Sequence, residues 1–186
     1  MADNSGPDNS AATSDPATKP FAPNTDELLE RNKTFAANFA DADLQVAPKR
    51  QLAVVECMDS RMDTFQILGL EHGAAHIIRN AGGVVTDDVI RSLCLSQRFL
   101  GTREIILIHH TDCGLERVNE AEFKNELEAE LGVKPWWALE TFTDPYADVR
   151  QSIQRLHLTP FVLYKDHIRG FVYDVTDGLL REVEVQ

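Results

Sequence analysis

The sequence lacks several features that would place it in a specialised class of protein. None of its apolar runs approaches the roughly 20 residues that are needed to span a bilayer. The chain does not begin with the basic and apolar regions of a secretory signal. Basic side chains are scarce, with 18 Lys and Arg against 30 Asp and Glu, and the resulting net charge of -12 repels phosphate backbones. These absences predict a cytoplasmic protein that binds neither a membrane nor a nucleic acid.

Cysteine is also rare, and its odd number argues against a disulfide framework. The chain has three cysteines, Cys57, Cys94 and Cys113, whereas a disulfide scaffold normally has an even set in a small secreted domain. We therefore expect reduced thiols that serve core packing, metal ligation or nucleophilic chemistry. Cys94 falls on the apolar side of a predicted helix, which indicates core packing for that thiol.

The N-terminal segment differs in composition from the rest of the chain. Residues 1–24 hold four of the eight prolines and few large apolar side chains, so we predict a disordered tail. Residues 25–186 are predicted to form a single domain, which begins with a helix that Asn24 or Thr25 can cap. This N-terminal helical arm has an apolar stripe made of Leu28, Leu29, Phe35 and Phe39. The sequence leaves open whether the stripe packs on its own domain or on another subunit.

Strands and helices alternate along the middle of the chain. Short apolar runs rich in β-branched residues predict strands at 52–57, 76–80 and 104–109. Helical patterns at 62–70 and 87–100 separate these strands. Such an order implies parallel pairing with right-handed crossovers. We therefore predict an α/β fold in which helices flank a mostly parallel central sheet.

The remainder of the chain adds further elements to this fold. Charged, amphipathic patterns predict helices at 119–131 and 145–158. Two apolar runs, 161–164 and 168–175, predict a late pair of strands. A turn at 176–178 then precedes a last short strand.

Reactive side chains follow two of the predicted strands. In an open α/β sheet, functional groups gather beyond the carboxyl ends of the strands. If the first and third strands are neighbours, one edge of the sheet collects Cys57, Asp59, Arg61, His109, His110, Asp112 and Cys113.

Zinc is the simplest chemistry for this set, because thiolate and imidazole are its preferred ligands. His110 and Cys113 are three residues apart, so a single turn of backbone places both on one side, and Cys57 completes a Cys2His set. Three protein ligands leave one tetrahedral position, as in catalytic zinc sites. Asp59 can fill that position or accept a hydrogen bond from a water there, and Arg61 has the fork geometry to orient the carboxylate.

Other interpretations of these residues remain open. Either Cys57 or Cys113 could be a nucleophile activated by His110, although this leaves the second thiol unexplained. A non-catalytic structural zinc module, with Asp59 as a permanent fourth ligand, is a further alternative. His109 points away from His110 in an alternating strand, and is either a core histidine or a proton shuttle.

The motif C-x-D-S-R at 57–61, followed by H-x-x-C-G at 110–114, resembles the zinc signature of the β-class carbonic anhydrases. The stretch R-N-A-G at 79–82 resembles the same family, and the match spans about residues 54–115. Within the family, the chain most resembles the short bacterial and fungal subgroup. Some members of that subgroup hydrolyse carbonyl sulfide.

The resemblance implies one Zn²⁺ per chain, with Cys57, His110 and Cys113 as ligands, and a catalytic dyad made of Asp59 and Arg61. It also implies a homodimer or a larger assembly of dimers, with the N-terminal helix reaching across the interface.

Two residues depart from the common family pattern near the pocket. His109 stands where glycine is common, and Gly83 stands where asparagine is common. Gly82 and Gly83 are our candidates for lining the substrate pocket, because backbone amides at glycines can approach an anionic product closely.

We hypothesise an enzyme that acts on a small molecule. The leading activity is that of a lyase (carbonate dehydratase): reversible hydration of carbon dioxide to bicarbonate by zinc-bound hydroxide. Asp59 would accept the hydrogen of the hydroxide, and Arg61 would keep Asp59 ionised. The alternative on the same site is hydrolysis of carbonyl sulfide to carbon dioxide and hydrogen sulfide.

Overall fold

A computed structural model of the chain describes residues 21–185. Most of the disordered tail predicted for residues 1–24 therefore lies outside the described residues. The chain divides into two compact units, one ending at Ala42 and the other spanning Asp43–Gln186, and each is described by itself. The first unit contains α1 (Thr25–Ala37), so the helix expected after Asn24 is present. The packing partner of its apolar stripe, and the single domain over 25–186, stay predictions.

The second unit is built on one five-stranded sheet, as the alternation of strands and helices predicted. The strand order is β2-β1-β3-β4-β5; the first four strands run parallel, and β5 is antiparallel to β4. The strands are β1 (Leu52–Cys57), β2 (Ala75–Asn80), β3 (Glu104–His110), β4 (Ile168–Tyr173) and β5 (Leu180–Glu182). The first and third predicted strands are therefore neighbours, and the mostly parallel α/β fold is confirmed.

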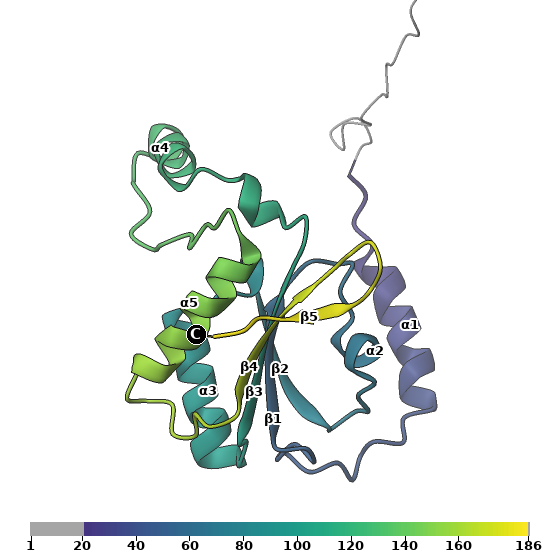
Figure 1. Cartoon of the computed structure of the whole chain (residues 1–186). Helices are drawn as coiled ribbons and strands as arrows, with labels where there is room; N and C mark the ends of the chain where they lie inside the picture. The colour runs from purple at the N-terminus through teal and green to yellow at the C-terminus, as the bar shows by residue number, and fades with distance from the viewer. Residues whose placement is uncertain (1–20, 186) are drawn as a thin grey trace, which may run out of the picture. The chain divides into compact units, whose positions relative to one another are not determined.

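Helices cover both faces of this sheet. Figure 1 shows α3 (Asp87–Leu100) and α5 (Pro145–Leu158) on one face and α2 (Thr64–Leu68) on the other. Successive residues of β1 alternate between the two apolar clusters, with Val55 facing α3 and α5 and Val54 facing α2. Because β1 is buried on both faces, its sequence is an almost continuous apolar run.

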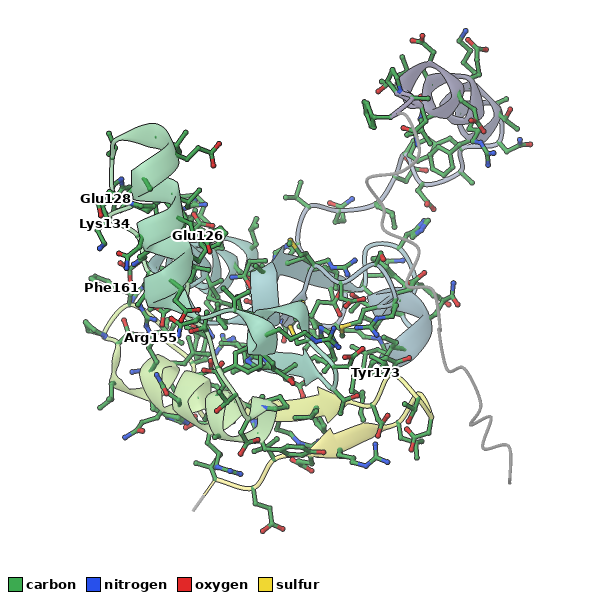
Figure 2. The ribbon with its side chains drawn as sticks, turned by 90° about the horizontal axis from the view of Figure 1, so that it is seen from above. Glu126, Glu128, Lys134, Arg155, Phe161 and Tyr173 are labelled. Atoms are coloured by element: carbon green, nitrogen blue, oxygen red, sulfur yellow. The ribbon has the colours of Figure 1, made fainter. Side chains whose placement is uncertain are left out.

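The helix α4 (Glu120–Leu131) belongs to an excursion that stands away from the sheet (Figure 1). None of its residues is buried. Glu128 and Lys134 lie on this excursion (Figure 2), with their charged groups 3.4 Å apart. None of the helices within residues 21–185 combines the length and the apolar character needed to cross a membrane.

One predicted strand is wrong. Residues 161–164 have no strand structure, although 168–173 do. The reason lies in the buried side chain of Gln97 on α3, whose Oε1 accepts hydrogen bonds from the main-chain N–H groups of Leu163 and Tyr164. Its Nε2 donates to the carbonyl of Tyr164. A side chain thus satisfies backbone groups that a neighbouring strand would otherwise bind.

Candidate metal centre

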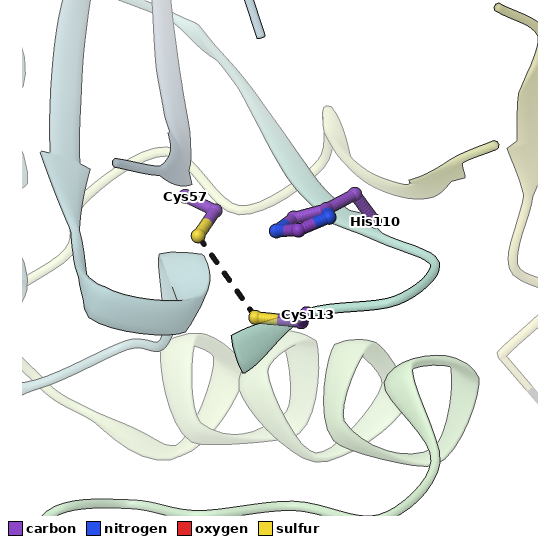
Figure 3. A group of neighbouring side chains, drawn as sticks. All are labelled: Cys57, His110 and Cys113. Carbon is purple, nitrogen blue, oxygen red and sulfur yellow. Dashed lines mark hydrogen bonds between the residues drawn. The ribbon is translucent and has the colours of Figure 1, made fainter. Parts of the chain in front are cut away.

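The carboxyl ends of β1 and β3 bring three metal-binding side chains together. Cys57 is the last residue of β1 and His110 is the last residue of β3. Cys113 follows one turn later, just before the 3-10 helix Gly114–Arg117. Figure 3 shows the two sulfurs and the imidazole converging, with the sulfurs 4.0 Å apart. One donor atom from each residue lies within 4.8 Å of the other two, and all three residues are buried.

The spacing of these donor atoms fits a tetrahedral zinc ion. With Zn–S near 2.3 Å and Zn–N near 2.0–2.1 Å, ligand atoms of a shared ion are about 3.5–3.8 Å apart. The sulfurs, 4.0 Å apart, lie just beyond this range, and every pair of donor atoms lies within 4.8 Å. Three protein ligands would leave a fourth position on such an ion, as in catalytic zinc sites.

The imidazole of His110 is oriented for metal binding. Its Nδ1 donates a hydrogen bond to the carbonyl of Thr111 at 2.9 Å, which leaves Nε2 with a free lone pair. This Nε2 is buried and has no hydrogen-bond partner in the described part of the chain. A buried polar atom without a partner is costly, and a cation bound there would satisfy it.

The electrostatics of the sulfur pair also favour a cation. Hydrogen bonding to Cys113 lowers the pKa of the Cys57 thiol, and the same contact raises the pKa of Cys113. Backbone hydrogen bonds to Asp59 and Gly82 further lower the pKa of Cys57. Burial alone would lower the pKa of His110, but the adjacent Cys57 sulfur makes the net shift upward. A divalent cation bound here would favour the ionised form of both thiols, so metal binding would displace thiol protons.

Asp59 stands beside this cluster and is held by Arg61. The Arg61 Nε donates to Asp59 Oδ1 at 3.0 Å, and Nη2 donates to Oδ2 at 2.8 Å. The Arg61 main-chain N–H also donates to Oδ1, at 2.9 Å. These hydrogen bonds from Arg61 hold the pKa of Asp59 well below its usual range. Asp59 Oδ2 lies 3.7 Å from His110 Nε2, so the ionised carboxylate faces the donor atoms.

Arg61 also contacts a second carboxylate, Asp112, to which our sequence analysis gave no role. Its Nη1 donates to Asp112 Oδ2 at 2.9 Å, and its Nη2 donates to the Asp112 carbonyl at 2.9 Å. Arg117 pairs with the other carboxylate oxygen, Oδ1. Asp112 was visible in the sequence as a residue between two ligands, but its pairing with Arg61 depends on loop geometry.

Arg79, which the sequence showed only as part of a motif, fixes the segment that carries Cys57 and Asp59. Its guanidinium donates to the carbonyl of Cys57 at 2.9 and 3.0 Å and to the carbonyl of Asp59 at 2.8 Å. It also approaches the fully buried carboxylate of Glu56 to within 3.2 Å. Burial raises the pKa of Glu56, while the hydroxyl of Thr64 and the charge of Arg79 oppose that rise.

The two candidate pocket glycines lie in a turn that packs against the end of β1. Gly82 and Gly83 are buried in a 3-10 turn at Ala81–Gly83, with φ angles of +82° and +71°. A Cβ at Gly83 would come within 2.8 Å of the main-chain N of Cys57. This close approach requires glycine, and it presses the turn against the end of β1.

Two other sequence candidates lie away from the donor atoms. His109 is buried and directs Nε2 to Asp148 Oδ2 on α5 at 2.6 Å, while its ring stacks against Phe142. It therefore points to the face opposite His110, as the strand alternation predicts. Cys94 is half-buried on α3, where it lines an apolar groove with Ile90 and Phe161.

Comparison with known proteins gives this geometry its context. A family model described as carbonic anhydrase matches residues 52–139. The chain is 50% identical over 159 residues to β-carbonic anhydrase 1 of Mycobacterium tuberculosis, which covers 86% of this chain and 97% of that protein. It is 54% identical over 92 residues to a carbon disulfide hydrolase of Saccharolobus solfataricus, covering 50% of this chain and 44% of that protein.

A solved structure agrees with these sequence relatives. The carbonic anhydrase of Streptococcus mutans superposes with a TM-score of 0.82 at 42% identity, and the match covers 89% of this chain and all of that one. The matched region includes both motifs, C-x-D-x-R at 57–61 and H-x-x-C at 110–113. The chain belongs to the β-carbonic anhydrase family and is an enzyme of that type.

Proposed function

We propose that this chain hydrates carbon dioxide reversibly to bicarbonate, with one zinc ion per chain held by Cys57, His110 and Cys113. The observation that carries the proposal is the position of Asp59. Its ionised Oδ2 lies 3.7 Å from the unpartnered Nε2 of His110, at the edge of the donor cluster. An anion held beside a three-ligand site can orient a nucleophile there, a task that a purely structural site does not require.

Zinc, when bound, lowers the pKa of water from 15.7 to about 7, so that hydroxide is available at neutral pH. Asp59 would accept the hydrogen of this nucleophile at Oδ2, because Oδ1 already receives two hydrogen bonds from Arg61. That hydrogen bond would direct the oxygen lone pair toward the carbon of the substrate.

Arg61 has two tasks in this scheme. Its charge keeps Asp59 ionised, and its two donor nitrogens fix the plane of the carboxylate. Gly82 and Gly83 stay our candidates for lining the substrate pocket, and their support is the close approach of the turn at 81–83 to the main chain of Cys57.

A rate measurement with zinc-quantified protein tests the proposal. We expect about one zinc per chain and stopped-flow hydration of carbon dioxide that is fastest above neutral pH, where more nucleophile is present. Zinc at this level without hydration above neutral pH would favour a structural zinc module, with Asp59 as a permanent ligand. Absence of zinc would favour a cysteine nucleophile.

Hydrolysis of a sulfur analogue is the second candidate function. It is supported by the match of half of this chain to a carbon disulfide hydrolase at 54% identity. Carbonyl sulfide and carbon disulfide are linear and electrophilic at carbon, like carbon dioxide, so the same hydroxide nucleophile, oriented by the same residues, would attack them. Rates on all three molecules, measured side by side with one zinc-quantified preparation, decide which substrate is preferred.

We further propose that residues 25–186 work as one zinc domain within a cytoplasmic homodimer or an assembly of such dimers. The support for this assembly is the family membership together with the exposed apolar stripe of α1. Light scattering after size-exclusion chromatography should give a mass of at least two chains, and a monomer at micromolar concentration would contradict the proposal.

A further inference from the structure

Arg61 is shared between two carboxylates that approach it from different elements. Asp59 follows β1 and receives hydrogen bonds from Nε and Nη2 of Arg61. Asp112 follows β3 and receives one on its side chain from Nη1 and one on its carbonyl from Nη2. The guanidinium is therefore held by two carboxylates at once.

The backbone of Asp112 indicates that this position is specialised. Asp112 lies between His110 and Cys113, the two ligands that come from one segment, and has a φ angle of +57°. Few residues other than glycine adopt this left-handed conformation without strain, although Asp and Asn do so more readily than most. Asp112 thus serves two purposes: its backbone makes the turn that leads to Cys113, and its carboxylate contacts Arg61.

We propose that Asp112 is a positioning residue, which holds the guanidinium of Arg61 in the orientation that presents Asp59 to the substrate. This inference rests on the proposed hydration function. Arg117 completes the arrangement, because it binds Asp112 Oδ1 and leaves Oδ2 for Arg61. The four side chains thus form a row of ion pairs with alternating charge, in the order Asp59, Arg61, Asp112 and Arg117.

The exposure of Arg61 explains why a second carboxylate is needed. The Arg61 side chain is 44% exposed, whereas the Asp59 side chain is 17% exposed. A single ion pair at such an exposed arginine is weakened by solvent and by the rotamer entropy of the long side chain. Additional hydrogen bonds to Asp112 reduce the number of orientations that the guanidinium can adopt.

The substitutions that test the proposal must keep the left-handed backbone. Asp112→Asn preserves the shape of the side chain and tolerates φ of +57°, but it removes the charge. Asp112→Gly removes the side chain and tolerates the same backbone. An alanine would add backbone strain, so its effect would not be specific to the contact with Arg61.

Asp177→Asn is the matched control. Asp177 pairs with Arg181 at 2.6 Å, and its side chain is 40% exposed, close to the 47% of Asp112. Both carboxylates are thus similar partners of a half-exposed arginine, but only Asp112 contacts Arg61. The control leaves every residue of the candidate site in place.

Two readouts are measured on the full-length protein. The first is kcat/KM for hydration of carbon dioxide, normalised to bound zinc. The second is the hydrogen-exchange rate of the Arg61 Nε–H by NMR, with and without zinc, with the signal identified by its loss in Arg61→Lys. This second readout does not depend on activity, and a merely structural role of Asp112 would not change it selectively.

We expect Asp112→Asn to lower kcat/KM by about three- to tenfold and to accelerate exchange of the Arg61 Nε–H by a similar factor. Asp112→Gly should show larger changes in both, with zinc content near that of the wild type. Asp177→Asn should match the wild type.

Either of two results would overturn the proposal. One is exchange of the Arg61 Nε–H at the wild-type rate in both Asp112 variants. The other is loss of zinc without faster exchange, which would make Asp112 a support for the ligand turn alone. A wild-type protein that binds zinc but does not hydrate carbon dioxide would instead refute the proposed function, while the exchange measurement would still report on Arg61.

Discussion

The two halves of the candidate site are stabilised in opposite ways. The first, which we call the ligand half, consists of Cys57, Cys113 and His110 and is buried, with these residues exposed by 4%, 2% and 0%. The second, which we call the charged half, consists of Asp59, Arg61 and Asp112. It is partly exposed to solvent, with the Arg61 and Asp112 side chains exposed by 44% and 47%. Strand pairing and packing fix the first half, whereas hydrogen bonds between ionised side chains fix the second.

This difference has a physical consequence for each half. Buried polar atoms that lack partners are costly, so the ligand half is incomplete without a cation. Exposed ion pairs are individually weak, so the charged half reaches a defined geometry only because Arg61 makes several hydrogen bonds at once. Substitutions in the first half should therefore affect metal content, and substitutions in the second should affect rate.

The largest expected effect comes from Cys57→Ser in the ligand half. A serine hydroxyl is a much poorer zinc ligand than a thiolate, so we expect loss of bound zinc and a loss of hydration activity of at least about a thousandfold. Zinc quantification and stopped-flow rates check both results. Cys94→Ser is the control, because Cys94 lies on α3 outside the cluster and should keep both properties. Full zinc and activity in Cys57→Ser would exclude Cys57 from the site.

Asp59→Asn tests the charged half and should give the opposite pattern. The amide keeps the size of the side chain but loses the charge that accepts the hydrogen of the nucleophile. We expect zinc content to stay near one per chain while the hydration rate falls by about a hundredfold. The same zinc and rate measurements apply. An undiminished rate would show that Asp59 is only a structural partner of Arg61.

Gly83→Ala probes how tightly the ligand half is packed. A Cβ there would meet main-chain atoms of Cys57, Glu56 and Ile108 at 2.8–3.0 Å, and backbone atoms cannot swing aside as a side chain can. The φ angle of +71° adds strain. We expect a loss of about 2–4 kcal/mol in the free energy of unfolding, measured in urea.

Gly101→Ala separates strain from collision in that experiment. Gly101 has a similar φ of +76°, but a Cβ there would meet nothing within 4 Å. Gly101→Ala should lower the free energy of unfolding by only about 1 kcal/mol, since the backbone strain is the only penalty. Equal losses for the two alanines would mean that the turn at 81–83 does not press on the end of β1.

The sequence predicted the ligand half better than the charged half, for a physical reason. Parallel strands bring their carboxyl ends to one edge, so the strand pattern placed Cys57 and His110 together on the condition, met by the structure, that their strands are neighbours. The contact of Asp112 with Arg61 depends on a left-handed residue in a loop, which no periodicity encodes. The wrong strand at 161–164 has a similar origin, because a single side chain, Gln97, binds that backbone.

The smallest effect expected is a pH dependence of stability in the charged half. Arg61 holds the pKa of Asp59 below its unfolded value of about 3.9. A carboxyl group with a depressed pKa stabilises the fold fully above its unfolded pKa, and this contribution is lost as pH falls through the folded pKa. The wild type should therefore exceed Asp59→Asn in free energy of unfolding by a constant margin above about pH 5, and the margin should shrink below about pH 4. Urea unfolding of both proteins between pH 3 and 7 measures it, because titration common to the two cancels in the difference. A margin that is the same at pH 3 and pH 7 would mean that the pairing with Arg61 does not stabilise the ionised form, and the charged half would then lack the electrostatic basis argued for it.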